Sequence, residues 1–147
     1  MPHQSPPQPP TPSPAQPGPA AFDKAANTGT RHFINAARFS CRGLAMAYRN
    51  ESAFRQELVL LLASLPLAAW LAAGPVQWVL LVGVVLLVMI VELLNSGLEA
   101  CVDRIGVEHH NLSGLAKDLG SAAVMLALVL AGLVWASVLA ERFWPLW

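Results

Sequence analysis

The sequence predicts an all-α membrane protein, a helical bundle with three transmembrane helices and an amphipathic helix ahead of them at the membrane interface. Of its 147 residues, 55% are hydrophobic and 12% are charged, which is unlike an ordinary soluble domain. Three long apolar runs supply the predicted spans, and a stretch with arginines on one face precedes them. The first 20 residues have no apolar core typical of a signal peptide, so insertion is expected to use the internal helices.

Residues 1–28 are predicted to be a disordered tail. They are rich in Pro, Gln and Ser, and such a composition buries too little apolar surface to offset the entropy lost on ordering. Residues 29–147 are predicted to form the membrane-embedded domain.

The segment at about 31–49 has the pattern of an interfacial helix. At about 100° per residue, its four arginines fall within roughly 40° of one another. Apolar residues occupy the other side, which suits a helix with arginines toward anionic head groups. An amphipathic helix packed on its own protein is the alternative. The arginines are Arg31, Arg38, Arg42 and Arg49.

Transmembrane helices are predicted at about 54–73, 76–98 and 119–140. The first two contain apolar runs slightly shorter than the twenty or so residues of a full span, and Gly74-Pro75 between them allows only a short turn. They are therefore expected to form a helical hairpin, whereas the third run is long enough to span alone.

The basic residues predict the orientation. Eight of the nine Lys and Arg residues precede the last apolar run, so the amino terminus is expected in the cytoplasm and the carboxyl terminus outside. The protein is thus predicted to be a multi-pass membrane protein. Trp70, Trp78, Trp144 and Trp147 then cluster at the outer interface, whereas Trp135 is expected to serve packing.

A polar stripe follows the second apolar run. If this segment is helical, Glu99 and Asp103 fall within about 20° of Glu92 around the helix axis. Ser96 falls within about 40°, and Asn95 lies at the edge of the stripe. A carboxylate next to a bilayer is unfavourable without cations, protons or partners, so Glu92 is a functional hypothesis by default. A solvated helix face outside the membrane is a real alternative for Asp103 but a weak one for Glu92, which directly follows an apolar run.

The depth of Glu92 favours chemistry at the interface. The preceding apolar run covers about 24 Å, which puts Glu92 near the cytoplasmic boundary and Glu99 about 10 Å further out. Phosphoryl transfer needs a divalent metal, a carboxylate for the acceptor hydroxyl and nearby cations. Glu51 lies on the same side as Glu99 and can share a metal with it. Lys117, followed by Asp118, can pair with phosphate or act as a positive-inside anchor.

Other common sites are not recognisable. The sequence has no Walker or protein-kinase glycine loop, so a nucleotide site must be built from helix ends and side chains. His109 and His110 are adjacent, which is too close for a helical HxxxH metal pair. Cys41 and Cys101 have no metal-ligand spacing and are interpreted as free thiols.

Several sequence blocks resemble the prokaryotic integral-membrane diacylglycerol kinases, a family that includes undecaprenol kinases. The resemblance covers roughly residues 31–143 and leaves out the proline-rich tail. It is carried by Asn50-Glu51-Ser52-Ala53-Phe54-Arg55-Gln56-Glu57, Val91-Glu92-Leu93-Leu94-Asn95-Ser96, Glu99-Ala100, Val102-Asp103-Arg104, Ala116-Lys117-Asp118 and Gly120-Ser121-Ala122-Ala123.

The resemblance implies a homotrimer of the bacterial inner membrane that uses ATP and Mg2+ to phosphorylate diacylglycerol to phosphatidic acid, with no nucleic-acid partner. It implies that Glu92 is the general base and that Glu51 and Glu99 hold magnesium with the ATP phosphates. Implied nucleotide contacts are Glu108, His109, His110, Lys117 and Asp118. Implied lipid contacts are Arg55, Gln56, Glu57 and Ser121 beside Glu92, with Asn95 and Asp103 in support.

The sequence leaves the acceptor lipid and two other function classes open. The chain departs from the family pattern at His32, Phe39 and Cys41, and the acceptor is either diacylglycerol or undecaprenol. From a different class, a small oligomeric transporter or channel would use Glu92 as its proton or cation site. A noncatalytic scaffold would instead depend on Arg38 and Arg42.

Overall fold

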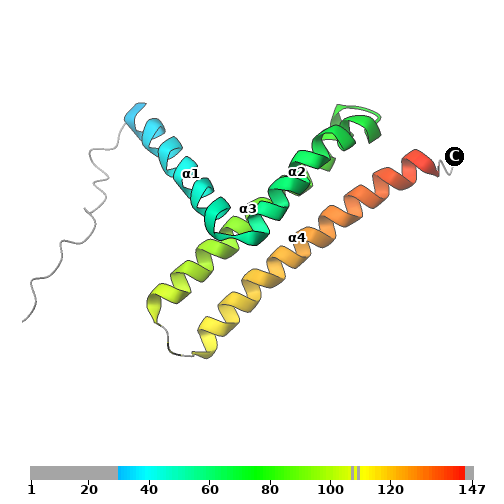
Figure 1. Cartoon of the computed structure of the whole chain (residues 1–147). Helices are drawn as coiled ribbons and strands as arrows, with labels where there is room; N and C mark the ends of the chain where they lie inside the picture. The colour runs from blue at the N-terminus through cyan, green and yellow to red at the C-terminus, as the bar shows by residue number, and fades with distance from the viewer. Residues whose placement is uncertain (1–29, 107, 109, 145–147) are drawn as a thin grey trace, which may run out of the picture. The chain divides into compact units, whose positions relative to one another are not determined.

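The computed structural model describes residues 30–106, 108 and 110–144, which form four α-helices without strands (Figure 1). The helices are α1 (Thr30–Asn50), α2 (Ser52–Leu71), α3 (Pro75–Ile105) and α4 (Asn111–Phe143). The predicted all-α class is therefore confirmed. The predicted disordered tail, 1–28, lies outside the described residues.

The chain divides into two compact units within α1, one ending at Arg38 and the other running from Phe39 to Trp147. In the first unit, the start of α1 exposes Phe33 and Ile34. The second unit contains the rest of α1 together with α2, α3 and α4, and it holds every contact described below.

Local sequence explains where the membrane helices begin and end. Glu51 has an extended backbone that separates α1 from α2, and α2 then continues through Pro66. Gly74 is also extended, and Pro75 occupies the first turn of α3, where its fixed φ suits a helix and its missing N–H costs nothing. Three helices, α2, α3 and α4, are long and apolar enough to cross a membrane.

α3 runs to Ile105, past the membrane span predicted at about 76–98, and it carries the polar stripe that begins at Glu92 on the same helix, as expected. α4 begins at Asn111, well before the predicted start near residue 119, because the polar segment ahead of the apolar run is also helical. Lys117 and Asp118, expected just before the third membrane helix, consequently lie within α4.

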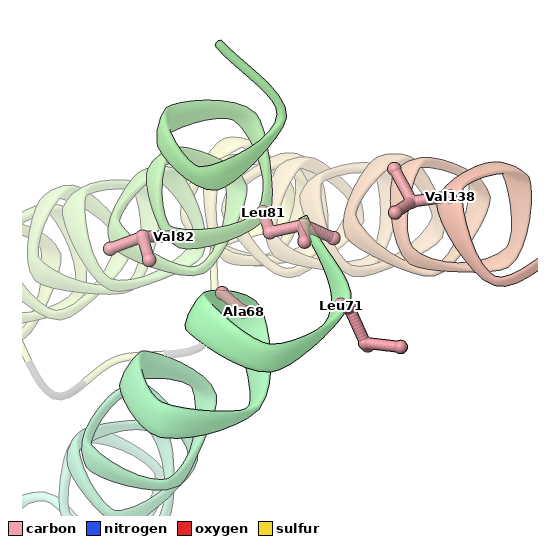
Figure 2. Close-up of a cluster of buried hydrophobic side chains, with 5 residues drawn as sticks. All are labelled: Ala68, Leu71, Leu81, Val82 and Val138. Carbon is pink, nitrogen blue, oxygen red and sulfur yellow. The ribbon is translucent and has the colours of Figure 1, made fainter. Parts of the chain in front are cut away.

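α3 packs against both α2 and α4. Figure 2 shows part of their common core, with Ala68 and Leu71 from α2, Leu81 and Val82 from α3, and Val138 from α4. Trp135 packs against this core, and its indole Nε1 donates a hydrogen bond of 3.1 Å to the Leu81 carbonyl. Its predicted packing role is confirmed.

Many large apolar side chains of α2, α3 and α4 are exposed outside this core. A contiguous apolar exterior is unfavourable in water, but it matches the hydrocarbon of a bilayer. Examples are Leu60 and Leu62 on α2, Val79 and Ile90 on α3, and Leu126 and Leu133 on α4.

A polar connection joins the three membrane helices near the α2–α3 turn. The Gln77 side chain accepts a hydrogen bond of 2.8 Å from the Ala73 backbone, and its Nε2 donates one of 2.9 Å to Glu141 on α4. Trp70 and Phe143 also approach there, with ring centroids 6.2 Å apart. One amide thus ties the end of α4 to the hairpin.

We expect Gln77→Leu to lower the free energy of unfolding by about 1–2 kcal/mol, because two hydrogen bonds are lost. Unfolding in detergent, followed by circular dichroism, measures this change. Val76→Leu on the same helix is the control, since Val76 is exposed. Equal stability of both variants and the parent chain would contradict a stabilising role for Gln77.

Candidate functional site

Two carboxylates from different helices are buried together, one near the start of α2 and one midway along α3. Glu57 on α2 and Glu92 on α3 are each 7% exposed. They are close enough for the Glu92 charge to act on Glu57. Burial of an acidic pair is costly unless a proton, a cation or a hydrogen-bond donor accompanies it. We call this region the carboxylate end.

Two further carboxylates reach the same region. The charges of Glu51 and Glu99 both act on Glu92. Glu51 stands at the N-cap position of α2, but its carboxylate makes no capping hydrogen bond. Glu99 is half-buried two turns beyond Glu92 on α3. Glu51 and Glu99 therefore each lie close enough to Glu92 for their charges to act on it within one chain.

A groove runs beside Glu51, between the end of α1 and the polar part of α3. Its volume is about 640 Å³. Small residues form much of its wall, so the backbone of both helices is accessible. They include Gly43 and Ala47 of α1 and Ser96, Gly97 and Ala100 of α3.

Asn95 links this region to α4. Its Nδ2 donates a hydrogen bond of 3.2 Å to Glu99 Oε1, which orients that carboxylate. Its Oδ1 is buried without a hydrogen-bond partner among the described residues, and it lies against Gly120 of α4. A Cβ added at Gly120 would overlap Asn95 Oδ1 and would lie 3.3 Å from Leu98 Cδ2. Only glycine allows this approach.

Gly120 is the residue that sequence reasoning missed as part of the site. The sequence block Gly120-Ser121-Ala122-Ala123 was used only as part of the family resemblance. The available signal was a stretch of small residues, since these let membrane helices approach closely.

A second hollow lies where α3 passes into α4. Its volume is about 450 Å³, and Glu108, His110 and Lys117 contribute to its lining. Lys117 Nζ lies 2.7 Å from Asp103 Oδ1 in an exposed ion pair, which contributes little stability because water screens both charges. A polyanion could therefore compete for Lys117.

His110 also has a structural role in this hollow. Its Nδ1 accepts a hydrogen bond of 3.2 Å from the Leu112 backbone and so caps the start of α4. Glu108 is exposed, and His109 lies outside the described residues.

The remaining predicted site residues are less closely engaged. Arg55 Nη1 donates to the carbonyls of Tyr48 and Arg49, at 3.1 and 3.3 Å, and so caps the end of α1. Three others are exposed on their helices, namely Gln56, Asp118 and Ser121.

The carboxylates among the described residues do not form a complete metal cage. Within the described ranges, no three His, Cys, Asp or Glu side chains gather closely enough to hold an ion. Magnesium, however, commonly keeps several waters and takes only one or two carboxylates plus substrate phosphates. Glu51 and Glu99 are carboxylates of that kind, and Glu51 lines the groove of about 640 Å³.

Comparison with known proteins identifies the family. Residues 38–139 match the sequence model of the prokaryotic diacylglycerol kinase family. The chain is 51% identical over 116 residues to a diacylglycerol kinase of Escherichia coli K12, covering 79% of this chain and 95% of that protein. It is 48% identical over 112 residues to the Haemophilus influenzae diacylglycerol kinase, with 76% and 95% covered. For the Pseudomonas aeruginosa diacylglycerol kinase the identity is 44% over 112 residues, with 76% and 91% covered.

The match includes α2 and α3 entirely, most of α4 and the part of α1 that borders the Glu51 groove. The chain belongs to the prokaryotic diacylglycerol kinase family.

Proposed function

We propose that this lipid kinase transfers the γ-phosphoryl group of MgATP to the hydroxyl of diacylglycerol, forming phosphatidic acid and ADP at the cytoplasmic membrane interface. The observation that carries the proposal is the burial of Glu92 beside Glu57, within reach of the charges of Glu51 and Glu99. A buried base beside an apolar membrane surface suits a lipid alcohol better than a soluble one.

Glu92 is proposed to act as the general base. As the lipid oxygen attacks the γ-phosphorus, its O–H bond breaks and the proton passes to the Glu92 carboxylate. The new P–O bond forms while the bond to the β-phosphate oxygen breaks, and ADP takes that electron pair. Glu92 then returns its proton to solvent.

Glu51 and Glu99 are proposed to hold magnesium with the ATP phosphates. When bound, the metal would neutralise phosphate charge. Asn95 supports this arrangement through its hydrogen bond to Glu99. The hollow at the α3–α4 connection is proposed to contact the nucleotide through Lys117, Glu108 and His110. The family resemblance also implies His109 and Asp118 as nucleotide contacts.

We propose that the chain lies in the bacterial inner membrane with its carboxylate end in the cytoplasm and its carboxyl terminus outside. The excess of basic residues before the last span supports this orientation. The exposed arginines of α1, Arg38, Arg42 and Arg49, suit an interfacial helix beside anionic head groups. Residues 29–147 would form the catalytic domain, assembled as a homotrimer.

A lipid-kinase assay tests the proposal. Purified protein in mixed micelles receives ATP labelled on its γ-phosphate, Mg2+, and either diacylglycerol or undecaprenol. We expect labelled phosphatidic acid and a higher kcat/KM for diacylglycerol. Preference for undecaprenol would reassign the acceptor. Ion flux in sealed vesicles, with neither lipid labelled, would overturn the kinase assignment.

A further inference from the structure

The backbone hydrogen bonding of α1 is interrupted at Glu51, where α1 gives way to α2. Glu51 has φ −103° and ψ 118°, an extended conformation that ends the helix. In a continuing helix, the carbonyls of Tyr48 and Arg49 would receive the N–H groups four residues further on. The extended residue removes those donors, so the last carbonyls of α1 need another partner.

Arg55 supplies this partner from the first turn of α2. Its Nη1 donates to the Tyr48 carbonyl at 3.1 Å and to the Arg49 carbonyl at 3.3 Å. A cation at the carboxyl end of a helix also interacts favourably with the helix dipole. The Arg55 backbone N–H meanwhile donates to the Glu51 carbonyl at 3.4 Å. The side chain therefore reaches back past Glu51 and links the two helices on either side of it.

This link is important because α1 has few other attachments. In the second compact unit, the described part of α1 packs only sparsely against the other helices, whereas α3 packs closely against α2 and α4. The same part of α1 contributes Ala47 and Asn50 to the wall of the groove beside Glu51, and α3 contributes Ser96 and Ala100. The direction of α1 thus sets the width of this groove.

We propose that Arg55 is a positioning residue that fixes the α1–α2 junction and so holds the Glu51 carboxylate and the α1 wall of its groove in place for the metal and the phosphates. The inference rests on the proposed function, because it takes Glu51 as a metal ligand. The family resemblance implies a lipid contact for Arg55, whereas this role acts through the protein backbone.

The distance between two native thiols tests the link between the helices. Cys41 on α1 and Cys101 on α3 are exposed, and the chain has two cysteines. Both are spin-labelled in chains diluted with unlabelled, cysteine-free protein, and pulsed electron paramagnetic resonance gives the distance within one chain. We expect a narrow distribution in the parent chain and a shift to longer, broader distances in Arg55→Gln. Arg55→Lys should be intermediate, since its ammonium can still donate to a carbonyl.

Metal affinity tests the consequence for the site. Mn2+ is titrated in the presence of a nonhydrolysable ATP analogue, and the Mg2+ dependence of diacylglycerol phosphorylation is measured alongside. We expect Arg55→Gln to weaken Mn2+ binding about tenfold, within the range for losing a group that supports a metal ligand. The Mg2+ concentration at half-maximal rate should rise by a similar factor. Neither kcat at saturating Mg2+ nor the KM for diacylglycerol should change appreciably.

Arg142→Gln is the matched control, because it removes the same charge from the exposed last turn of α4. It should leave the distances and the Mn2+ affinity unchanged. If Arg55→Gln fails to fold, Arg55→Lys provides the comparison, with smaller shifts in the same direction.

Parent-like distances in Arg55→Gln would overturn the positioning role. So would parent-like Mn2+ affinity with a raised KM for diacylglycerol, which would show that Arg55 contacts the lipid. Altered distances together with Mn2+ binding that is insensitive to Glu51→Gln would support the link between the helices and would overturn the proposed metal site instead.

Discussion

Glu92→Gln is expected to lower kcat for phosphatidic acid formation by roughly 10²–10⁴-fold, the range typical of losing a general base. Glutamine keeps the shape of glutamate but cannot accept the lipid proton at neutral pH. The substitution also removes a buried charge, so the protein should fold at least as well. The measurement is single-turnover phosphoryl transfer with saturating MgATP and lipid.

Glu141→Gln controls for a general effect of losing a carboxylate, because Glu141 lies near the α2–α3 turn and bonds to Gln77. It should keep kcat within about twofold. If Glu92→Gln retained the parent rate while folded, the lipid proton would have to go to another group, and the assignment of Glu92 would be wrong.

Gly120→Ala is expected to lower kcat about 10²-fold and to destabilise the chain by about 1–3 kcal/mol. The added Cβ would overlap Asn95 Oδ1, so either α4 moves away from α3 or the Asn95 side chain turns away. Turning Asn95 breaks its hydrogen bond to Glu99 Oε1. A displacement near 1 Å at a catalytic group can cost a factor of that size.

Gly83→Ala adds the same methyl group to α3, where it meets nothing within 4 Å. It should leave kcat and unfolding nearly unchanged. Kinetics and unfolding in detergent are measured on both variants. Parent-like activity in Gly120→Ala would show that the close approach of α3 and α4 does not position Glu99.

The fold was largely predictable because crossing a bilayer requires an apolar run of about twenty residues, which is visible in the sequence. Each of the three apolar runs became a spanning-length helix, and Gly74-Pro75 became the turn that joins α2 to α3. The helix ends were not predictable from hydropathy, since α3 and α4 continue as polar helices beyond the apolar core. Lys117 was therefore misplaced outside the last helix.

The site residues that share one helix were predictable from the sequence, whereas the contacts between residues of different helices were less so. Periodicity put Glu92, Glu99 and Asp103 on one stripe, and the apolar run before Glu92 separated it from Asp103, which is exposed and pairs with Lys117. Contacts between helices, such as Asn95 with Gly120, depend on how the helices pack. Gln77 gave a partial signal as the single polar residue in its run, without identifying Glu141 as its partner.

The proposed mechanism requires Glu51 and Glu99 to bind one metal ion, whether within a chain or between protomers. Mn2+ substitutes for magnesium as an electron-paramagnetic probe, and titration of free Mn2+ with a nonhydrolysable ATP analogue gives its affinity for the protein. The measurement is made on the parent chain, Glu51→Gln, Glu99→Gln and the double variant, as a double-mutant cycle.

We expect each single variant to weaken Mn2+ binding by about tenfold or more. In the double variant the loss of affinity should be far smaller than the product of the two single losses, because both side chains bind the same ion. Effects that multiply independently, or Mn2+ binding unchanged in either single variant, would contradict a shared metal site at the carboxylate end.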